Sequence, residues 1–179
     1  MKRYAFGVDV GGTTIKMGIF ETNGNLLDMW EIPTRVQENG KYILGDIAEA
    51  AENKIEEKSI SKLDIEGIGM GVPGPVGEDG TVFKCVNLGW GIFNVEQELQ
   101  SLTGLKVKAG NDANVAALGE MWQGGGKGYK NLVMVTLGTG VGGGIIINER
   151  ILSGADGAAG EIGHIPMREE EQETCGCGK

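Results

Sequence analysis

The stretch FGVDVGGTTIKMGIF, residues 6–20, sets the architecture of the first half of the chain. Apolar residues on both sides of a Gly/Thr cluster predict two strands, residues 4–11 and 13–21, joined by a glycine turn. Glycines allow successive backbone N–H groups to converge on an anion, and threonine hydroxyls add donors. The stretch therefore predicts a phosphate-binding turn. Its residues are Gly11, Gly12, Thr13 and Thr14.

Two charged residues flank this turn. Asp9 ends the first predicted strand, where its carboxylate can hold Mg²⁺ directly or through water, because magnesium prefers oxygen ligands and keeps much of its hydration. Lys16 lies on the same face of the second strand as Thr14. The pattern is neither a Walker A motif nor a dinucleotide fingerprint, because a strand rather than a helix follows the glycines. It favours a phosphate clamp of another kind.

A second stretch, MVTLGTGVGGGIIIN at residues 134–148, repeats this order of strand, Gly/Thr turn and strand. One such hairpin in each half predicts two related lobes that face each other across a cleft, with a boundary near residues 123–130. Two unrelated hairpins are the alternative, since glycine turns between strands are common. The residues of the second turn are Gly138, Thr139, Gly140, Gly142 and Gly143.

The rest of the chain alternates extended and helical patterns, which predicts an α/β fold. Asn94 is expected to cap the second helix and Gly104 to end it. Val115, Leu118 and Trp122 are expected along one face of the third helix. The further predicted strands are residues 26–33, 65–74, 81–87 and 105–112, and the predicted helices are residues 41–59, 94–104 and 114–125.

The composition points to a cytoplasmic protein that acts on a small molecule. The formal net charge of −9 argues against a nucleic-acid partner, because such binding depends mainly on Lys and Arg. No apolar run approaches the length of a membrane span, and the first predicted strand leaves no room for a signal peptide. Three cysteines without an export signal predict reduced thiols.

The NDAN stretch, residues 111–114, offers a candidate general base. Phosphoryl transfer needs a group that takes the proton of the attacking hydroxyl. Asp112 falls between a strand end and a helix start, where the positive end of the helix dipole favours a carboxylate. The residues alone also allow a plainer role for Asp112 as the cap of that helix.

The end of the chain carries possible zinc ligands. His164 is the only histidine, and Cys175 and Cys177 follow it, which gives three ligands of types that suit zinc. The alternative is a packing histidine and two incidental thiols. The acidic run REEEQE, residues 168–173, is most simply a solvated loop between the two ligand groups.

Together these residues resemble the ROK family of sugar kinases, and its bacterial glucokinases most. The similarity runs from Val8 to Lys179, with every motif in order. The motifs are GVDVGGTTIK, GVPGPV, VNLGW, AGNDANVAALGE, GTGVGGG, GAAGEIGH and CGCGK.

The resemblance implies the ribonuclease-H-like fold of the actin and hexokinase-type ATPases. Residues 1–123 would form the N-terminal α/β lobe, and residues 124–179 would form the beginning of a second, incomplete lobe. ATP and Mg²⁺ would lie in the cleft between the lobes, with the two glycine turns as phosphate loops. Asp112 matches the catalytic base of these kinases.

The same resemblance implies the sugar site. The reaction would be the phosphorylation of glucose at its 6-hydroxyl, and GVPGPV (residues 71–76) would lie near the sugar, although it also reads as a plain turn. Trp90 either lines this pocket or belongs to the core. The matching sugar-binding positions are Asn87, Asn111, Asp112, Glu161 and His164.

In ROK kinases the histidine after GE-x-G shares a structural zinc ion with the cysteines of C-G-C-G-x-x-G-C. Here His164, Cys175 and Cys177 match three ligands, and the pattern places the next cysteine beyond Lys179. A closed zinc site takes four ligands. The other ring nitrogen of His164 would then remain available for a sugar hydroxyl.

Several alternatives stay open at this point. The nearest alternative is a related kinase that acts on N-acetylmannosamine, fructose or another hexose. A sugar-responsive ROK repressor would need a DNA-binding module before the first strand, and three residues precede Tyr4 here. For the full-length form we expect a homodimer that binds neither nucleic acid nor membrane.

Overall fold

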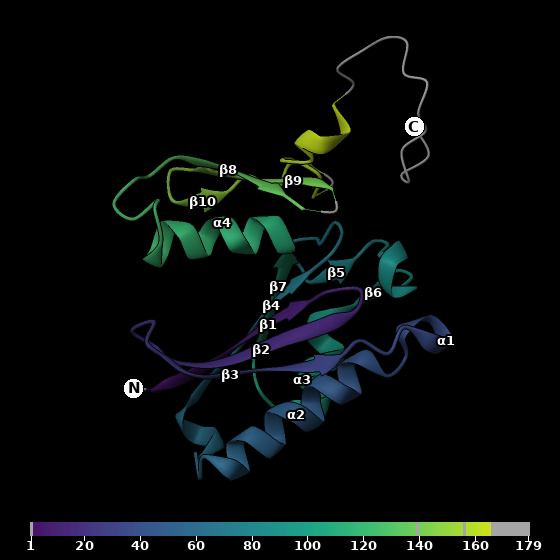
Figure 1. The fold of residues 1–179 in the computed structure, drawn as a ribbon, viewed down its shortest axis with the longest axis vertical. Helices are drawn as coiled ribbons and strands as arrows, with labels where there is room; N and C mark the ends of the chain where they lie inside the picture. Colours follow the sequence, from purple (N-terminus) through teal and green to yellow (C-terminus); the bar gives the residue numbers. More distant parts are fainter. Residues whose placement is uncertain (1, 139, 156, 166–179) are drawn as a thin grey trace.

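The computed structural model of the chain describes residues 2–138, 140–155 and 157–165, and it contains two larger sheets (Figure 1). The first sheet has the strand order β3-β2-β1-β4-β7. β2 runs antiparallel to both of its neighbours, β1 and β3, whereas β4 and β7 run parallel to β1. Its strands are β1 (Tyr4–Val10), β2 (Thr14–Glu21), β3 (Leu26–Pro33), β4 (Ile65–Val72) and β7 (Val107–Asn111).

The parallel strands position the site, because their carboxyl ends meet at one edge of the sheet. Asp9 pairs with Gly71 of β4, and the next residue of β4, Val72, pairs with Asn111 of β7. On its other side Asp9 pairs with Lys16 of β2. Residues far apart in the sequence are thereby brought to one edge.

Helices cover both faces of this sheet (Figure 1). α2 and α3 pack on one face, and α4 lies on the other, between the first sheet and the second. Asn94 caps α3 through its side chain, and Gly104 ends it in the left-handed conformation, as predicted. The helices are α1 (Gln37–Gly40), α2 (Ile43–Glu57), α3 (Val95–Thr103) and α4 (Asp112–Gln123).

The second sheet has the order β10-β9-β8 and packs on α4 through β8 and β9. A further two-stranded ribbon joins β5 to β6. Three short 3₁₀ turns complete the described elements. The strands are β8 (Leu132–Leu137), β9 (Val141–Ile147), β10 (Arg150–Ile151), β5 (Thr81–Val82) and β6 (Phe93–Asn94), and the turns are η1 (Lys62–Asp64), η2 (Val86–Leu88) and η3 (Ile162–His164).

The main core lies between the first sheet and α2 and α3, and side chains alternate into it from the strands. Trp90 belongs to this core, where its indole N–H donates to the carbonyl of Gly40 at 3.1 Å. The alternative that placed Trp90 in the core is therefore confirmed. Fully buried members include Phe6, Ile15, Met17, Ile19, Ile43, Ile47 and Leu99.

One predicted strand is shorter in the structure, and the large apolar residues of α4 are not its buried ones. The strand expected over residues 81–87 ends at Val82, because the chain turns back on itself at Cys85, which pairs with Trp90. Leu118 and Trp122 are not on the buried face of α4: their exposed fractions are 39% and 54%. The buried residues of α4 are Ala113, Asn114 and Ala117, because glycine-rich β9 packs closely against small side chains.

No helix among the described residues is long and apolar enough to cross a membrane.

Candidate active site

A cleft of about 440 Å³ lies where β1, β4 and the start of α4 meet β8. It contains the predicted metal-binding residue Asp9 and the predicted base Asp112. Two carboxylates that are about 100 residues apart in the sequence thus share one hollow. The lining residues are Val8, Asp9, Gly71, Asp112, Ala113, Val115, Ala116 and Thr136.

Asp9 lies in the field of two charged neighbours. Its pKa is raised above the ordinary aspartate value, first by burial and then by the negative charge of Asp112, while the charge of Lys16 lowers it. A divalent cation beside Asp9 would offset the first two effects, because it favours the ionised carboxylate. Asp9 and Asp112 offer carboxylate oxygens to the cleft, and oxygen is the ligand type that Mg²⁺ prefers.

The first glycine turn is tight and held by its neighbours. The N–H of Gly11 donates to the carbonyl of Thr14 at 3.1 Å, and a Cβ on Gly11 would lie 2.7 Å from that carbonyl oxygen. The hydroxyl of Thr34 donates to the carbonyl of Gly11 at 2.7 Å. Gly12 faces Asn87, whose Cβ would lie 3.9 Å from a Cβ on this glycine. The turn thus brings Asn87 beside the phosphate-binding candidates.

The cap of α4 is Asn111 rather than Asp112. The Asn111 Oδ1 accepts from the N–H of Asn114 at 3.2 Å, and its Nδ2 donates to the carbonyl of Gly74 at 3.3 Å. Asp112 Oδ1 accepts from the adjacent N–H of Ala113 at 2.7 Å. The plainer role for Asp112 is therefore wrong, and its carboxylate lines the cleft.

The second glycine turn approaches the segment that carries the predicted sugar ligands. The N–H of Gly138 donates to the carbonyl of Gly140 at 3.0 Å, and Thr139 lies outside the described residues. A Cβ on Gly143 would lie 2.5 Å from the carbonyl oxygen of Gly160. Only glycine permits this approach, which places residues 160–164 against β9.

Glu161 and His164 lie together in this segment, with His164 Nε2 3.6 Å from Glu161 Oε2. They do not line the 440 Å³ cleft. Nearby, a Cβ on Gly157 would lie 3.0 Å from the carbonyl oxygen of Val76, so the GVPGPV loop contacts the same segment. Two groups result: Asp9 and Asp112 in the cleft, and Glu161 with His164 in the segment that packs on β9.

The predicted zinc site is not placed by the structure. Cys175 and Cys177 lie outside the described residues. Within residues 2–138, 140–155 and 157–165 no group of three His, Cys, Asp or Glu side chains is arranged to hold a metal ion. The remaining cysteine, Cys85, is buried and its thiol donates to the carbonyl of Pro73. Burial raises the pKa of this thiol to about 11, which marks it as a structural rather than a reactive group.

Two polar residues, one in the cleft and one buried in α4, were given no role from the sequence. Thr136 lines the cleft from β8, and a single threonine inside an apolar strand gave no signal. Asn114 is 7% exposed, and its Oδ1 has no hydrogen-bond partner within the part of the chain that the structure describes. Its position in NDAN was noted, but its burial depends on how α4 packs.

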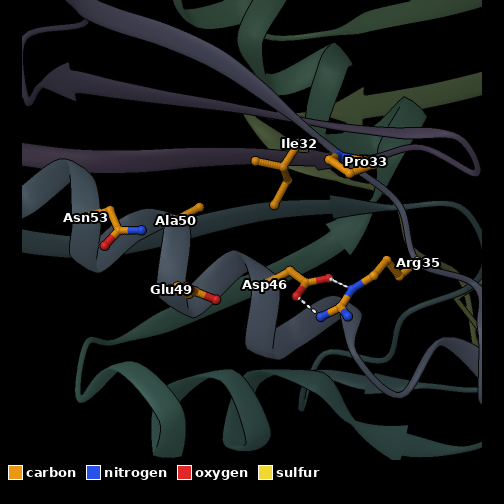
Figure 2. Close-up of a pocket in the computed structure, with 7 residues that line it drawn as sticks. All are labelled: Ile32, Pro33, Arg35, Asp46, Glu49, Ala50 and Asn53. Atoms are coloured by element: carbon orange, nitrogen blue, oxygen red, sulfur yellow. Dashed lines mark hydrogen bonds and ion pairs between the residues drawn. The ribbon is translucent and has the colours of Figure 1, made fainter.

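A second hollow, of about 260 Å³, lies at the β3 edge of the first sheet, between β3 and α2 (Figure 2). Arg35 pairs with both oxygens of Asp46 there, and its guanidinium lies 4.6 Å from the ring centre of Tyr42. The ion pair fixes the segment after β3 to α2. None of the predicted site residues lines this hollow. Its lining residues are Ile32, Pro33, Arg35, Asp46, Glu49, Ala50 and Asn53.

Comparison with known proteins agrees with this architecture. The central sheet, the helices on both faces and the second glycine hairpin define a mixed α/β fold of the actin and hexokinase-type ATPases. The model of the ROK family matches residues 5–179. The chain belongs to the ROK family.

Sugar kinases are among the individual relatives. The chain is 50% identical to a glucokinase from Halalkalibacterium halodurans over 99% of its own length and 54% of that protein. It is 33% identical to an N-acetyl-D-glucosamine kinase from Yersinia enterocolitica, over 97% of its length and 59% of that protein. A ROK family glucokinase from Streptomyces griseus, crystallised with glucose and AMPPNP, matches with a TM-score of 0.84 and 34% identity, over 98% of this chain and 54% of that one. The chain thus spans about half the length of these relatives.

Proposed function

We propose that the protein is an ATP-dependent hexose kinase in which Asp112 is the general base. The observation that carries this proposal is the shared cleft of Asp9 and Asp112 next to the first glycine turn. The family membership and the sugar kinases among its relatives support the reaction class.

The described side chains suggest a division of roles. The carboxylate of Asp112 accepts the proton of the attacking sugar hydroxyl. Asp9 holds Mg²⁺, which would neutralise charge on the phosphates, and Lys16 faces Asp9 across the strand pair. The predicted phosphate-binding donors are the first turn (Gly11, Gly12, Thr13, Thr14) and the second (Gly138, Thr139, Gly140, Gly142, Gly143).

We assign the sugar to the side of the cleft where the GVPGPV loop meets residues 157–164. Asn111 bonds this loop through Gly74 while Asp112, its neighbour, faces the cleft, which couples the loop to the base. The proposed sugar-binding residues are Asn87, Asn111, Asp112, Glu161 and His164.

Glucose is the proposed hexose, because a relative with 50% identity is a glucokinase. An amino sugar is the alternative, since a relative with 33% identity is an N-acetyl-D-glucosamine kinase. N-acetylmannosamine and fructose remain further candidates. We also propose cytoplasmic location, lobes of residues 1–123 and 124–179, and a homodimer in the full-length form.

Structural zinc stays a prediction for His164, Cys175 and Cys177. If zinc orients His164, its removal should weaken sugar binding and raise the KM for the hexose. Metal analysis of the full-length protein, followed by kinetics after chelation, measures this effect. An unchanged KM after verified zinc removal would contradict the link.

The reaction class is tested by measuring ADP release by the full-length protein with ATP, Mg²⁺ and a panel of hexoses. The panel contains glucose, fructose, N-acetylmannosamine and N-acetylglucosamine. We expect the largest kcat/KM with glucose. ADP release that no sugar stimulates would contradict the proposed function, and a larger value with an amino sugar would contradict only the choice of glucose.

A further inference from the structure

Thr136 is the third polar side chain that lines the cleft, besides Asp9 and Asp112. It is the penultimate residue of β8, along which exposure alternates. Val135 and Leu137 point away from the cleft, with exposed fractions of 50% and 82%. Thr136 therefore belongs to the face of β8 that packs toward α4, and it lines the cleft together with Asp9 and Asp112.

Gly142 makes room for the Thr136 side chain. The two residues are partners across the β8–β9 pair. A Cβ on Gly142 would lie 2.5 Å from the Thr136 Oγ1 and 3.5 Å from the Cβ of Ala113. The hydroxyl thus occupies the space over a residue without a side chain, next to the first turn of α4 that carries Asp112.

The two carboxylates of the cleft make a hydrogen-bond donor at Thr136 favourable for an anionic ligand. The polar side chains among the described lining residues are two carboxylates, Asp9 and Asp112, and the hydroxyl of Thr136. Ionised carboxylates only accept hydrogen bonds, whereas a threonine hydroxyl can donate. An anionic phosphoryl group that enters this space is repelled by both carboxylates, and Thr136 is the side-chain donor of the lining set that can offset this repulsion.

We propose that the Thr136 hydroxyl donates a hydrogen bond to the terminal phosphoryl group of the bound nucleotide, where this group passes between Asp9 and Asp112. The inference rests on the proposed function and extends it to a strand residue outside both glycine turns. Thr136 transfers no proton: it holds an oxygen of the phosphoryl group while Asp112 accepts the proton of the sugar hydroxyl. Because ADP lacks the terminal group, the contact distinguishes nucleoside triphosphate from diphosphate.

The test compares calorimetric binding of Mg²⁺-AMPPNP and Mg²⁺-ADP to full-length wild type, Thr136→Val and Thr136→Ser. A hydrogen bond to a charged group contributes a factor of about 10 to 100 in affinity, so Thr136→Val should bind AMPPNP weaker by that factor. Its ADP affinity should stay within about twofold, since ADP makes no such contact. Thr136→Ser should retain both affinities, because it keeps the hydroxyl.

Thr22→Val is the matched control. Thr22 follows β2, and its hydroxyl bonds the carbonyl of Lys2 rather than a cleft residue. This variant should bind both nucleotides like the wild type. If Thr136→Val does not fold, as judged by circular dichroism, Thr136→Ala replaces it with the same expectations.

Equal losses for AMPPNP and ADP, no loss for either, or a wild type that does not bind AMPPNP would overturn the inference. The hexose panel distinguishes a failure of this inference from a failure of the proposed function. Hydroxyl-dependent AMPPNP binding without phosphorylation of any hexose contradicts the proposed function alone. Hexose phosphorylation by the wild type, with normal AMPPNP binding by a folded Thr136→Val, contradicts this inference alone.

Discussion

At the scale of single residues, the two carboxylates of the cleft influence each other. Burial is the larger cause of the raised pKa of Asp9, and the charge of Asp112 is the second. Since protonated Asp9 cannot ligate a cation, Mg²⁺-nucleotide affinity should fall as the pH is lowered through this pKa.

Asp112→Asn removes one of the two effects that raise the pKa of Asp9. The pKa of Asp9 should then decrease, so the loss of Mg²⁺-AMPPNP affinity should occur at lower pH than in the wild type. A titration of binding between about pH 4 and pH 7 covers the ordinary and the raised range. Asp64→Asn, in the η1 turn, is the control and should leave the midpoint unchanged. Identical midpoints for Asp112→Asn and wild type would contradict the coupling.

The start of α4 shows how far single residues can be interpreted from the sequence. Asn111 and Asp112 are both good helix caps, so the sequence did not determine which of them fills that role. The hydrogen bond from Asn114 N–H to Asn111 decides it, and this bond depends on where α4 begins. The role of Asp9 could be predicted from the sequence, because its position at the end of a strand follows from the strand pattern alone.

At the scale of elements, α4 was predicted as a helix with Val115, Leu118 and Trp122 along one face, and the helix is confirmed. The large apolar residues Leu118 and Trp122 suggested that face, yet they are exposed. The surface of α4 that packs on β9 consists of small side chains, since Gly142 and Gly144 of β9 lie against Ala113. Hydrophobic periodicity detects large side chains and gives little signal for close packing of small ones.

This close packing makes Gly144 intolerant of a side chain. A Cβ there would lie 2.6 Å from the carbonyl oxygen of Ala113 and 2.7 Å from the Cβ of Ala117. Gly144→Ala should lower the free energy of unfolding by about 1–3 kcal/mol, as overpacking does in other cores. Chemical denaturation measures the change.

Gly119→Ala is the control for this substitution, because a Cβ at that helical position meets nothing within 4 Å. It should raise the free energy of unfolding by about 0.5–1 kcal/mol through its helix propensity. Equal effects of the two substitutions would show that β9 does not pack on α4 as described.

At the scale of the whole molecule, the sheet order unites the site. Residues of β1, β4 and the β7–α4 junction meet because parallel strands end at one edge. The repeated glycine hairpin predicted the second sheet correctly, but its docking on α4 requires three-dimensional packing. The zinc prediction could not be followed, since Cys175 and Cys177 lie outside the described residues.

The second sheet also exposes apolar side chains on the face away from α4. Val133, Val135 and Leu137 have exposed fractions of 66%, 50% and 82%. Such a patch favours association, so the 179-residue chain should self-associate in sedimentation experiments. Val133→Thr together with Val135→Thr should reduce this association. Unchanged association in the folded double variant would contradict a role of this face.

The most direct test of the central claim is glucose-dependent ADP release by the full-length wild type and Asp112→Asn, measured side by side. If Asp112 is the base, the wild type turns over and the variant has a kcat lower by about 10²-fold or more, with an unchanged circular dichroism spectrum. Near-wild-type kcat in the folded Asp112→Asn variant would contradict the account.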